Sequence, residues 1–126
     1  MPLQALTFAN NVPLGYSDVD FTYQGRMDYT ISTPEKTRLI VRLAYGVNEY
    51  DLEYTGWPAE RCELLAQMAV LGLGCVGVLT DGWRWLFARL DGGRVTFSGL
   101  WDLRRGEVGV VVAALVACFE GVGMGF

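Results

Sequence analysis

The chain has no histidine, and its three cysteines do not form the pattern of a metal or redox site. Without imidazole there is no Ser–His or Cys–His catalytic pair and no zinc site that needs a histidine ligand. Cys62, Cys75 and Cys118 are odd in number, widely spaced and set among apolar residues, which predicts reduced, buried thiols. We therefore expect neither a histidine-dependent hydrolase nor a disulfide-bonded scaffold.

The sequence also lacks a hydrophobic run long enough to cross a membrane. Its longest apolar stretch, Val108–Phe119, lies between Glu107 and Glu120 and is much shorter than the about 20 residues that a bilayer requires. Residues Met1–Ala5 show no basic leader followed by an apolar segment, so we expect no secretory signal and an intracellular location, cytoplasmic or nuclear. No repeat, linker or low-complexity segment interrupts the sequence, and we expect a single domain over residues 1–126.

Charged residues are scarce, at 19% of the chain, against 52% hydrophobic residues, and this balance excludes global disorder. The net charge of −4 argues against a partner that is bound through phosphates, because such proteins usually carry a basic footprint. One local basic cluster keeps nucleic acid open as a partner class. It consists of Arg84, Arg89, Arg94, Arg104 and Arg105.

Apolar periodicity and turn residues predict the elements of the fold. We expect a strand or bent hairpin over 20–31, strands over 38–45 and 48–54, a helix over 58–73, a meander over 75–80, 83–90 and 94–100, and a helix over 102–120. The valines of the last segment keep a strand as its alternative. Residues 1–20, with Pro13 and Asn10–Asn11, predict turns or a short lead-in helix. The order predicts an α/β (α+β) fold, in which a mixed sheet of about five to six strands is flanked by two main helices.

Four segments together are similar to a known family. They are Gly25–Ile31 (GRMDYTI), Leu39–Ala44 (LIVRLA), the helix that contains Gln67, and Gly77–Trp85 (GVLTDGWRW). This succession resembles the PD-(D/E)XK restriction-endonuclease-like superfamily. It is most similar to the N-terminal domains of type I restriction subunits and to fungal Crinkler-like effector domains. The resemblance implies a small restriction-endonuclease-like core.

In that family, one strand supplies a metal-binding Asp, the next supplies Glu and Lys, and a following helix carries Gln. Asp28 matches the metal ligand and Gln67 matches the helix Gln, but Arg42 and Ala44 stand where Glu and Lys are expected. Mg²⁺ needs several carboxylate oxygens, whereas an arginine repels the cation and cannot act as a base. The resemblance therefore implies a catalytically degenerate copy of the fold that has no resident cofactor.

An active Mg²⁺-dependent nuclease is the alternative, and it requires acids that have moved to new positions. Glu60 and Glu63, on the predicted helix, are the first candidates to join Asp28 around the metal, and Glu49 and Asp51 come next. In the structural interpretation, Asp28 makes a turn or a local backbone hydrogen bond instead.

The candidate binding residues combine polar and aromatic side chains; they are Arg42, Gln67, Trp83, Arg84 and Trp85. Arg42 lies within an apolar strand, so its burial would require an ion pair, with Asp28 or Glu63 as the partner. Gln67 has a plainer interpretation as a polar residue at the edge of its helix. Trp83, Trp85 and Phe87 alternate, which predicts one shared face that either stacks on a base or partner, or packs in the core.

These features predict a protein that acts by binding, as a non-catalytic interaction module with an effector or inhibitor-like role. The helix that contains Val108–Phe119 is apolar all round, so we expect a second copy, in a homodimer, or another protein partner to cover it. The alternatives are the nuclease with relocated acids and a structural subunit of a homo-oligomer or larger assembly.

Overall fold

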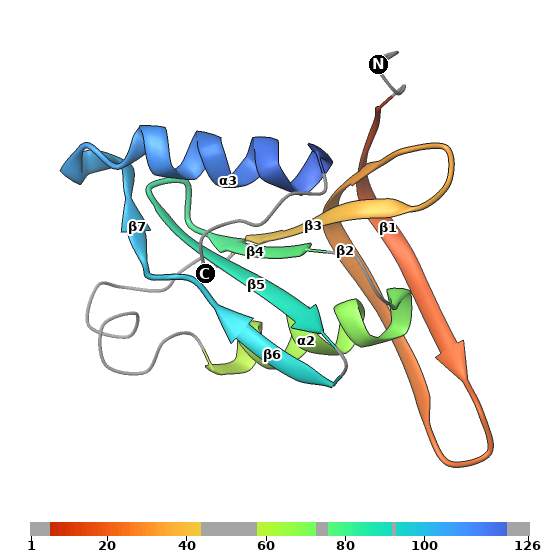
Figure 1. Ribbon diagram of the computed structural model, residues 1–126. Coiled ribbons are helices and arrows are strands. Elements are labelled where there is room, and N and C mark those ends of the chain that lie inside the picture. Colours follow the sequence, from red (N-terminus) through yellow and green to blue (C-terminus); the bar gives the residue numbers. More distant parts are fainter. Residues whose placement is uncertain (1–5, 44–57, 73–75, 92, 121–126) are drawn as a thin grey trace.

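The computed structural model of the protein describes residues 6–43, 58–72, 76–91 and 93–120. The predicted strand over 48–54, with Glu49 and Asp51, lies outside these residues. The elements in chain order (Figure 1) are β1 (Thr7–Ser17), β2 (Thr22–Ser32), β3 (Thr37–Leu43), α2 (Pro58–Leu71), β4 (Val76–Thr80), β5 (Arg84–Asp91), β6 (Arg94–Phe97), β7 (Trp101–Asp102), the 3-10 helix η1 (Leu103–Arg105) and α3 (Val108–Glu120).

The strands form one mixed sheet in the order β1-β2-β3-β4-β5-β6, and β7 pairs with β5 beyond the end of β6. β3 and β4 are parallel, and α2 lies between them in the chain; the other strand pairs are antiparallel. Parallel neighbours need such a crossover connection, because a tight turn cannot return the chain to the same end of the sheet. The predicted fold class, a mixed sheet with two helices, is confirmed.

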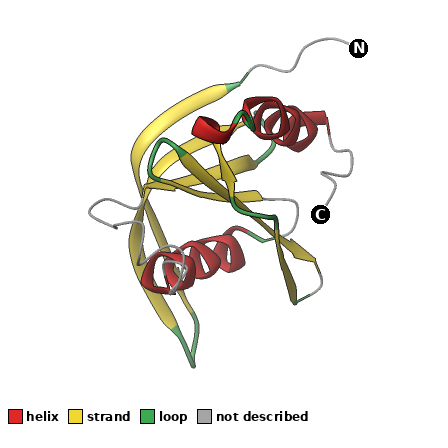
Figure 2. Cartoon of the chain, turned by 90° about the vertical axis from the view of Figure 1, so that its left-hand side faces the viewer, coloured by secondary structure: helices red, strands yellow, loops and turns green. Residues whose placement is uncertain are grey.

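The two helices cover opposite faces of the sheet (Figure 2). Neighbouring residues of β3 and β4 alternate between the faces, with Ile40 and Leu79 beneath α2 and Leu39 and Val78 beneath α3. The α2 core consists of Met27, Ile40, Leu64, Met68, Leu79, Leu86 and Ala88. The α3 core consists of Leu39, Val76, Val78, Phe87, Val111, Ala114 and Cys118. Both faces of the central strands are therefore apolar, which explains their unbroken hydrophobic runs.

The expectation of turns or a lead-in helix over residues 1–20 was wrong, because residues 7–17 form the edge strand β1. Pro13 is tolerated there since an edge strand has no neighbour on its outer side that needs the missing N–H group. Asn11 has a φ of 51°, a region that asparagine enters more readily than most residues. Asn11, which predicts a turn in isolation, thus lies at a kink of β1, and Pro13 lies within the same edge strand.

The β1–β2 hairpin bends around the side of the sheet that α2 covers (Figure 2). Met27 packs in the α2 core and Ile31 packs against the α3 core, although an even spacing on a straight strand would place both on one face. The side chains of β2 therefore change from one face of the sheet to the other between Met27 and Ile31. Asn11 lies opposite that segment. Arg26 Nη1 donates a hydrogen bond of 3.2 Å to the carbonyl oxygen of Asn11, which ties the two strands at the bend.

α2 confirms the predicted helix over 58–73, and the predicted meander is present as β4, β5 and a shortened β6. The predicted helix over 102–120 is present only from Val108, as α3, because β7 and η1 occupy residues 101–105. The strand alternative for its valines was wrong. None of the helices described is long and apolar enough to cross a membrane.

The cysteines are free where they are described, but only one is buried. Burial raises the pKa of the Cys118 thiol to about 11, so this thiol stays protonated within the α3 core. Cys62 is exposed on α2, so the prediction of a buried thiol was wrong there. Cys75 lies outside the described residues.

Gly77 allows α2 to approach β4 closely, and this contact generates a stability prediction. A Cβ atom at position 77 would lie 2.5 Å from Met68 Sδ and 2.9 Å from Leu64 Cδ2. Gly77→Ala should therefore lower the free energy of unfolding by about 1–3 kcal/mol through overpacking, as measured by urea denaturation. Gly109→Ala is the control, because no atom lies within 4 Å of a Cβ there and alanine favours the helix. Equal stability of Gly77→Ala and the wild type would contradict the packing.

Candidate functional site

Asp28, the predicted metal ligand, lies half-buried in β2. Its Oδ2 atom accepts a hydrogen bond of 2.9 Å from the backbone N–H of Leu43, the last residue of β3. The carboxylate thus satisfies a strand-end amide, which is the backbone hydrogen bond that the structural interpretation of Asp28 proposed.

Three other predicted residues gather around Tyr23 on the α2 side of the sheet. Tyr23 donates a hydrogen bond of 2.5 Å from its hydroxyl group to Glu63 Oε1. Gln67 lies one helical turn from Glu63. Gln67 acts on the Tyr23 phenol as a hydrogen-bonding neighbour, and Arg42 acts on it through its charge. We call Tyr23, Glu63, Gln67 and Arg42 the α2 polar cluster.

Gly25 makes room for the α2 polar cluster. A Cβ atom at position 25 would overlap the Tyr23 hydroxyl group and lie 3.0 Å from Glu63 Oε1. Burial, followed by the hydrogen bond to Glu63, raises the pKa of Tyr23, and these effects exceed the opposing ones of Gln67 and Arg42. The phenol therefore remains a protonated hydrogen-bond donor at neutral pH.

Two buried atoms of the α2 polar cluster have no hydrogen-bond partner among the residues that the structure describes. Gln67 is fully buried and uses Nε2 to donate a bond of 2.9 Å to the carbonyl oxygen of Arg26, but its Oε1 atom is unsatisfied. The Nε atom of Arg42 is also buried and unsatisfied. Within the described residues Arg42 forms no ion pair with Asp28 or Glu63, so the predicted pairing was wrong. Gln67 is likewise buried rather than at the edge of its helix.

The candidate acids do not form a metal site in the part of the chain that the structure describes. Glu63 belongs to the α2 polar cluster, Glu60 is half-buried in the first turn of α2, and Asp28 is bonded to Leu43. No group of three or more cysteine, aspartate and glutamate side chains in residues 6–43, 58–72, 76–91 and 93–120 could hold a cation.

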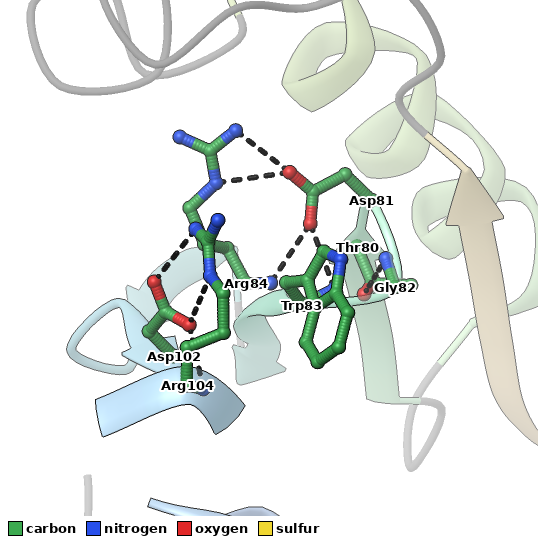
Figure 3. Close-up of polar contacts among 7 residues, drawn as sticks. All are labelled: Thr80, Asp81, Gly82, Trp83, Arg84, Asp102 and Arg104. Carbon is green, nitrogen blue, oxygen red and sulfur yellow. Dashed lines mark hydrogen bonds and ion pairs between the residues drawn. The ribbon is translucent and has the colours of Figure 1, made fainter. Parts of the chain in front are cut away.

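A second polar cluster closes the turn between β4 and β5 (Figure 3). Asp81 Oδ1 accepts hydrogen bonds from the backbone N–H groups of Trp83 and Arg84, at 2.9 and 2.8 Å. Asp81 Oδ2 accepts from Nε and Nη2 of the Arg84 guanidinium, at 2.9 and 2.7 Å. Arg84 is only 7% exposed, and this ion pair, in which two guanidinium nitrogens donate to one carboxylate oxygen, provides the charge compensation that a buried arginine needs.

Asp102 and Arg104 form a similar pair beside this turn (Figure 3). The two guanidinium–carboxylate hydrogen bonds measure 3.1 and 3.0 Å, and the Arg104 guanidinium lies 5.8 Å from the centroid of the Trp83 ring. The hydrogen bond from the Arg104 side chain is the main reason that the pKa of Asp102 is lowered. Arg84 and Arg104 therefore neutralise acids of the same fold.

The aromatic residues divide between the surface and the core, so the prediction that Trp83, Trp85 and Phe87 share one face was wrong. Trp83 precedes β5 in the turn and is 55% exposed. Trp85 packs against the α3 core and stacks with Phe87, with the ring centroids 6.3 Å apart. The core-packing interpretation therefore fits Trp85 and Phe87.

The chain was compared with protein-family models, curated proteins and solved structures. None of them matches. A function for this chain must therefore be argued from the surfaces and side-chain clusters that its own fold creates.

The most conspicuous of these surfaces is the outer side of α3. Val108, Val112 and Val116 follow one another at intervals of one helical turn and are 50%, 51% and 46% exposed. Gly109 and Ala113 lie beside them and are also exposed. No charged residue occurs from Val108 to Phe119. We call these five residues the α3 apolar face.

Two exposed aromatic residues also lie on the side of the sheet that α3 covers. Phe8 is 71% exposed and is paired with Ile31, whereas Tyr29 is exposed and is paired with Val41. Ile31 and Val41 pack against the α3 core, and directly paired residues project to the same face of a sheet. Phe8 and Tyr29 are therefore on the α3 side. Sequence reasoning identified the apolar helix but missed Tyr23, Phe8 and Tyr29.

Tyr23→Phe tests whether the α2 polar cluster is structurally important. The variant removes the donor to the Glu63 carboxylate and should lower the free energy of unfolding by about 1.5–3 kcal/mol, because hydrogen bonds to charged groups contribute that much. Tyr29→Phe is the matched control, since Tyr29 is exposed, and it should leave stability unchanged in urea denaturation. Identical losses for the two variants would contradict the assigned role of Tyr23.

Asp81 predicts a component of acid sensitivity. Burial alone raises the pKa of its carboxyl group, but the hydrogen bonds from Arg84 and Trp83 outweigh burial and lower the pKa. A lowered folded-state pKa stabilises the fold above the unfolded value of about 3.9, and this contribution is lost as the pH falls through the folded value. Asp81→Asn should reduce the free energy of unfolding at pH 7 and show a shallower fall below about pH 4. A pH profile of Asp81→Asn that is identical to that of the wild type would refute this role.

Proposed function

We propose that this protein is a non-catalytic interaction domain that binds other protein surfaces through the α3 apolar face. The observation that carries the proposal is the exposure of the valines along one side of α3, in a segment without charged residues from Val108 to Phe119. Large contiguous apolar patches are uncommon on monomeric proteins and mark sites of association. An effector or inhibitor-like role, or a role as a structural subunit, would use this same face.

The charged residues support a binding function over catalysis. Asp28 is bonded to the backbone of β3, Glu63 to Tyr23, and Asp81 to Arg84, so each of these carboxylates is engaged within the fold. A Mg²⁺-dependent nuclease needs carboxylate oxygens that converge on the cation instead. A degenerate PD-(D/E)XK ancestry, in which Arg42 replaces a catalytic acid, is part of this proposal.

The α3 apolar face can be tested with a fluorophore that binds exposed hydrophobic surface, such as ANS. At a protein concentration of about 1 μM, where weak complexes dissociate, the wild type should enhance ANS fluorescence. The double variant Val112→Asp/Val116→Asp should lose most of this enhancement. Val19→Asp is the matched control, because Val19 is 99% exposed in the β1–β2 turn, far from α3 in Figure 1. Equal enhancement by all three proteins would contradict the proposed binding face.

A cleavage assay tests the enzymatic alternative. Plasmid DNA and RNA should remain intact in the presence of the protein with Mg²⁺ or Mn²⁺, and Asp28→Ala should behave identically. Cleavage by the wild type that is absent in Asp28→Ala would establish a nuclease site and overturn the non-catalytic proposal.

A further inference from the structure

We infer that the partner of the α3 apolar face is a second copy of this chain, which packs its own α3 against the first in an antiparallel, two-fold symmetric arrangement. This inference rests on the proposed function and names the partner of the same face. It follows from the shape of the helix surface and from the charges at the ends of α3.

The surface of α3 is self-complementary. Val108, Val112 and Val116 form a ridge along the i, i+4 row, and Gly109 and Ala113 form a shallow row of small residues beside it. When two such helices pack, the ridge of one can lie over the small residues of the other. A two-fold axis makes this contact twice, because each copy offers the same surface.

The absence of charge on this face also favours a second copy. The whole chain carries a net charge of −4, so contacts between two copies elsewhere are opposed by repulsion on average. Two uncharged faces meet without that cost. A basic or acidic partner would find no opposite charge to pair with between Val108 and Phe119.

The ends of the helix favour the antiparallel direction. Arg105 is exposed in η1, immediately before the N-terminus of α3, and Glu120 is the last residue of α3. In an antiparallel pair Arg105 of each copy lies near the C-terminal end of the partner helix, where the helix dipole is negative. In a parallel pair Arg105 would lie near the partner's Arg105. The charges therefore select one of the two symmetric arrangements.

The size of the contact predicts a reversible dimer. α3 has 13 residues and is about 20 Å long, and a strip of that length about 10 Å wide covers on the order of 200 Å². Stable interfaces bury about 800 Å² on each partner, so α3 alone is too small for a permanent dimer. Phe8 and Tyr29 enlarge the same side of the molecule. We expect association that depends on protein concentration.

Sedimentation equilibrium of the full chain tests the dimer. Between about 1 μM and 1 mM, the average mass should rise from 13.9 kDa toward twice that value. Val112→Asp should remain monomeric at the highest concentration, while Val19→Asp should dimerise like the wild type. Arg105→Glu should also weaken dimerisation. Because this variant leaves the apolar residues intact, misfolding of the apolar face would not explain its effect.

Engineered cysteines test the direction of packing in a Cys62→Ser/Cys75→Ser background, in which Cys118, buried in the α3 core, is the cysteine that remains. Val112→Cys should form a disulfide-linked homodimer under mild oxidation, because position 112 lies at the centre of the face and meets itself across the axis. Val108→Cys should cross-link to Val116→Cys in a mixture but not to itself. The background protein without an added cysteine should give no covalent dimer.

The outcomes separate the two proposals. A monomer at every concentration, or a dimer that Val112→Asp does not affect, would overturn the second-copy inference. Efficient cross-linking of Val108→Cys to itself would overturn the antiparallel arrangement. If the protein is monomeric at every concentration and Val112→Asp/Val116→Asp loses ANS binding, the proposed function stands and the partner is another protein. Unchanged ANS binding in this variant would overturn the proposed function itself.

Discussion

The two-sided sheet is the constraint on which the rest of this structure depends. Its central strands β3 and β4 carry apolar side chains on both faces, and each face must be removed from water for the fold to be stable. The described chain supplies one long helix for each face. α2 lies in the chain between the parallel strands β3 and β4, whereas α3 follows the last strand, β7. α3 is also apolar on the side that does not touch the sheet. The helix that buries one face of the sheet therefore exposes a hydrophobic surface of its own.

Asp28, a candidate functional residue by sequence, and Asp81, which lies in the family-like segment Gly77–Trp85, stabilise backbone N–H groups of the same sheet instead. A strand end leaves backbone N–H groups without ladder partners, and an aspartate oxygen can accept from them. Asp28 does so for the last residue of β3, and Asp81 does so for the turn between β4 and β5. Asp81 directly follows β4, and Asp28 lies within β2 beside the end of β3. Ligand sites in open α/β folds also lie at strand ends, so these carboxylates resemble the parts of an active site.

Local signals in the sequence predicted the elements whose boundaries depend on nearby residues. The helical spacing before Gly72 and the Asp81–Gly82 turn are such signals, since the relevant backbone conformation is set within a few residues. β1 escaped prediction because Pro13 and Asn11 are turn residues in isolation, and only the position at the sheet edge makes them compatible with a strand. Contacts between distant residues were also inaccessible: Tyr23 and Glu63 are 40 residues apart and meet through the packing of α2 on β2. The separation of Trp83 from Trp85 depends on where the turn ends and β5 begins.

Methyl NMR spectroscopy of the valine side chains over a series of protein concentrations would test the central claim, that two copies of the chain associate through the α3 apolar face, most directly. The account predicts that the signals of Val108, Val112 and Val116 shift as the concentration rises, while that of Val78, buried in the α3 core, stays fixed. Constant signals for the three α3 valines, or shifts confined to Val95 on the β6 edge, would contradict it.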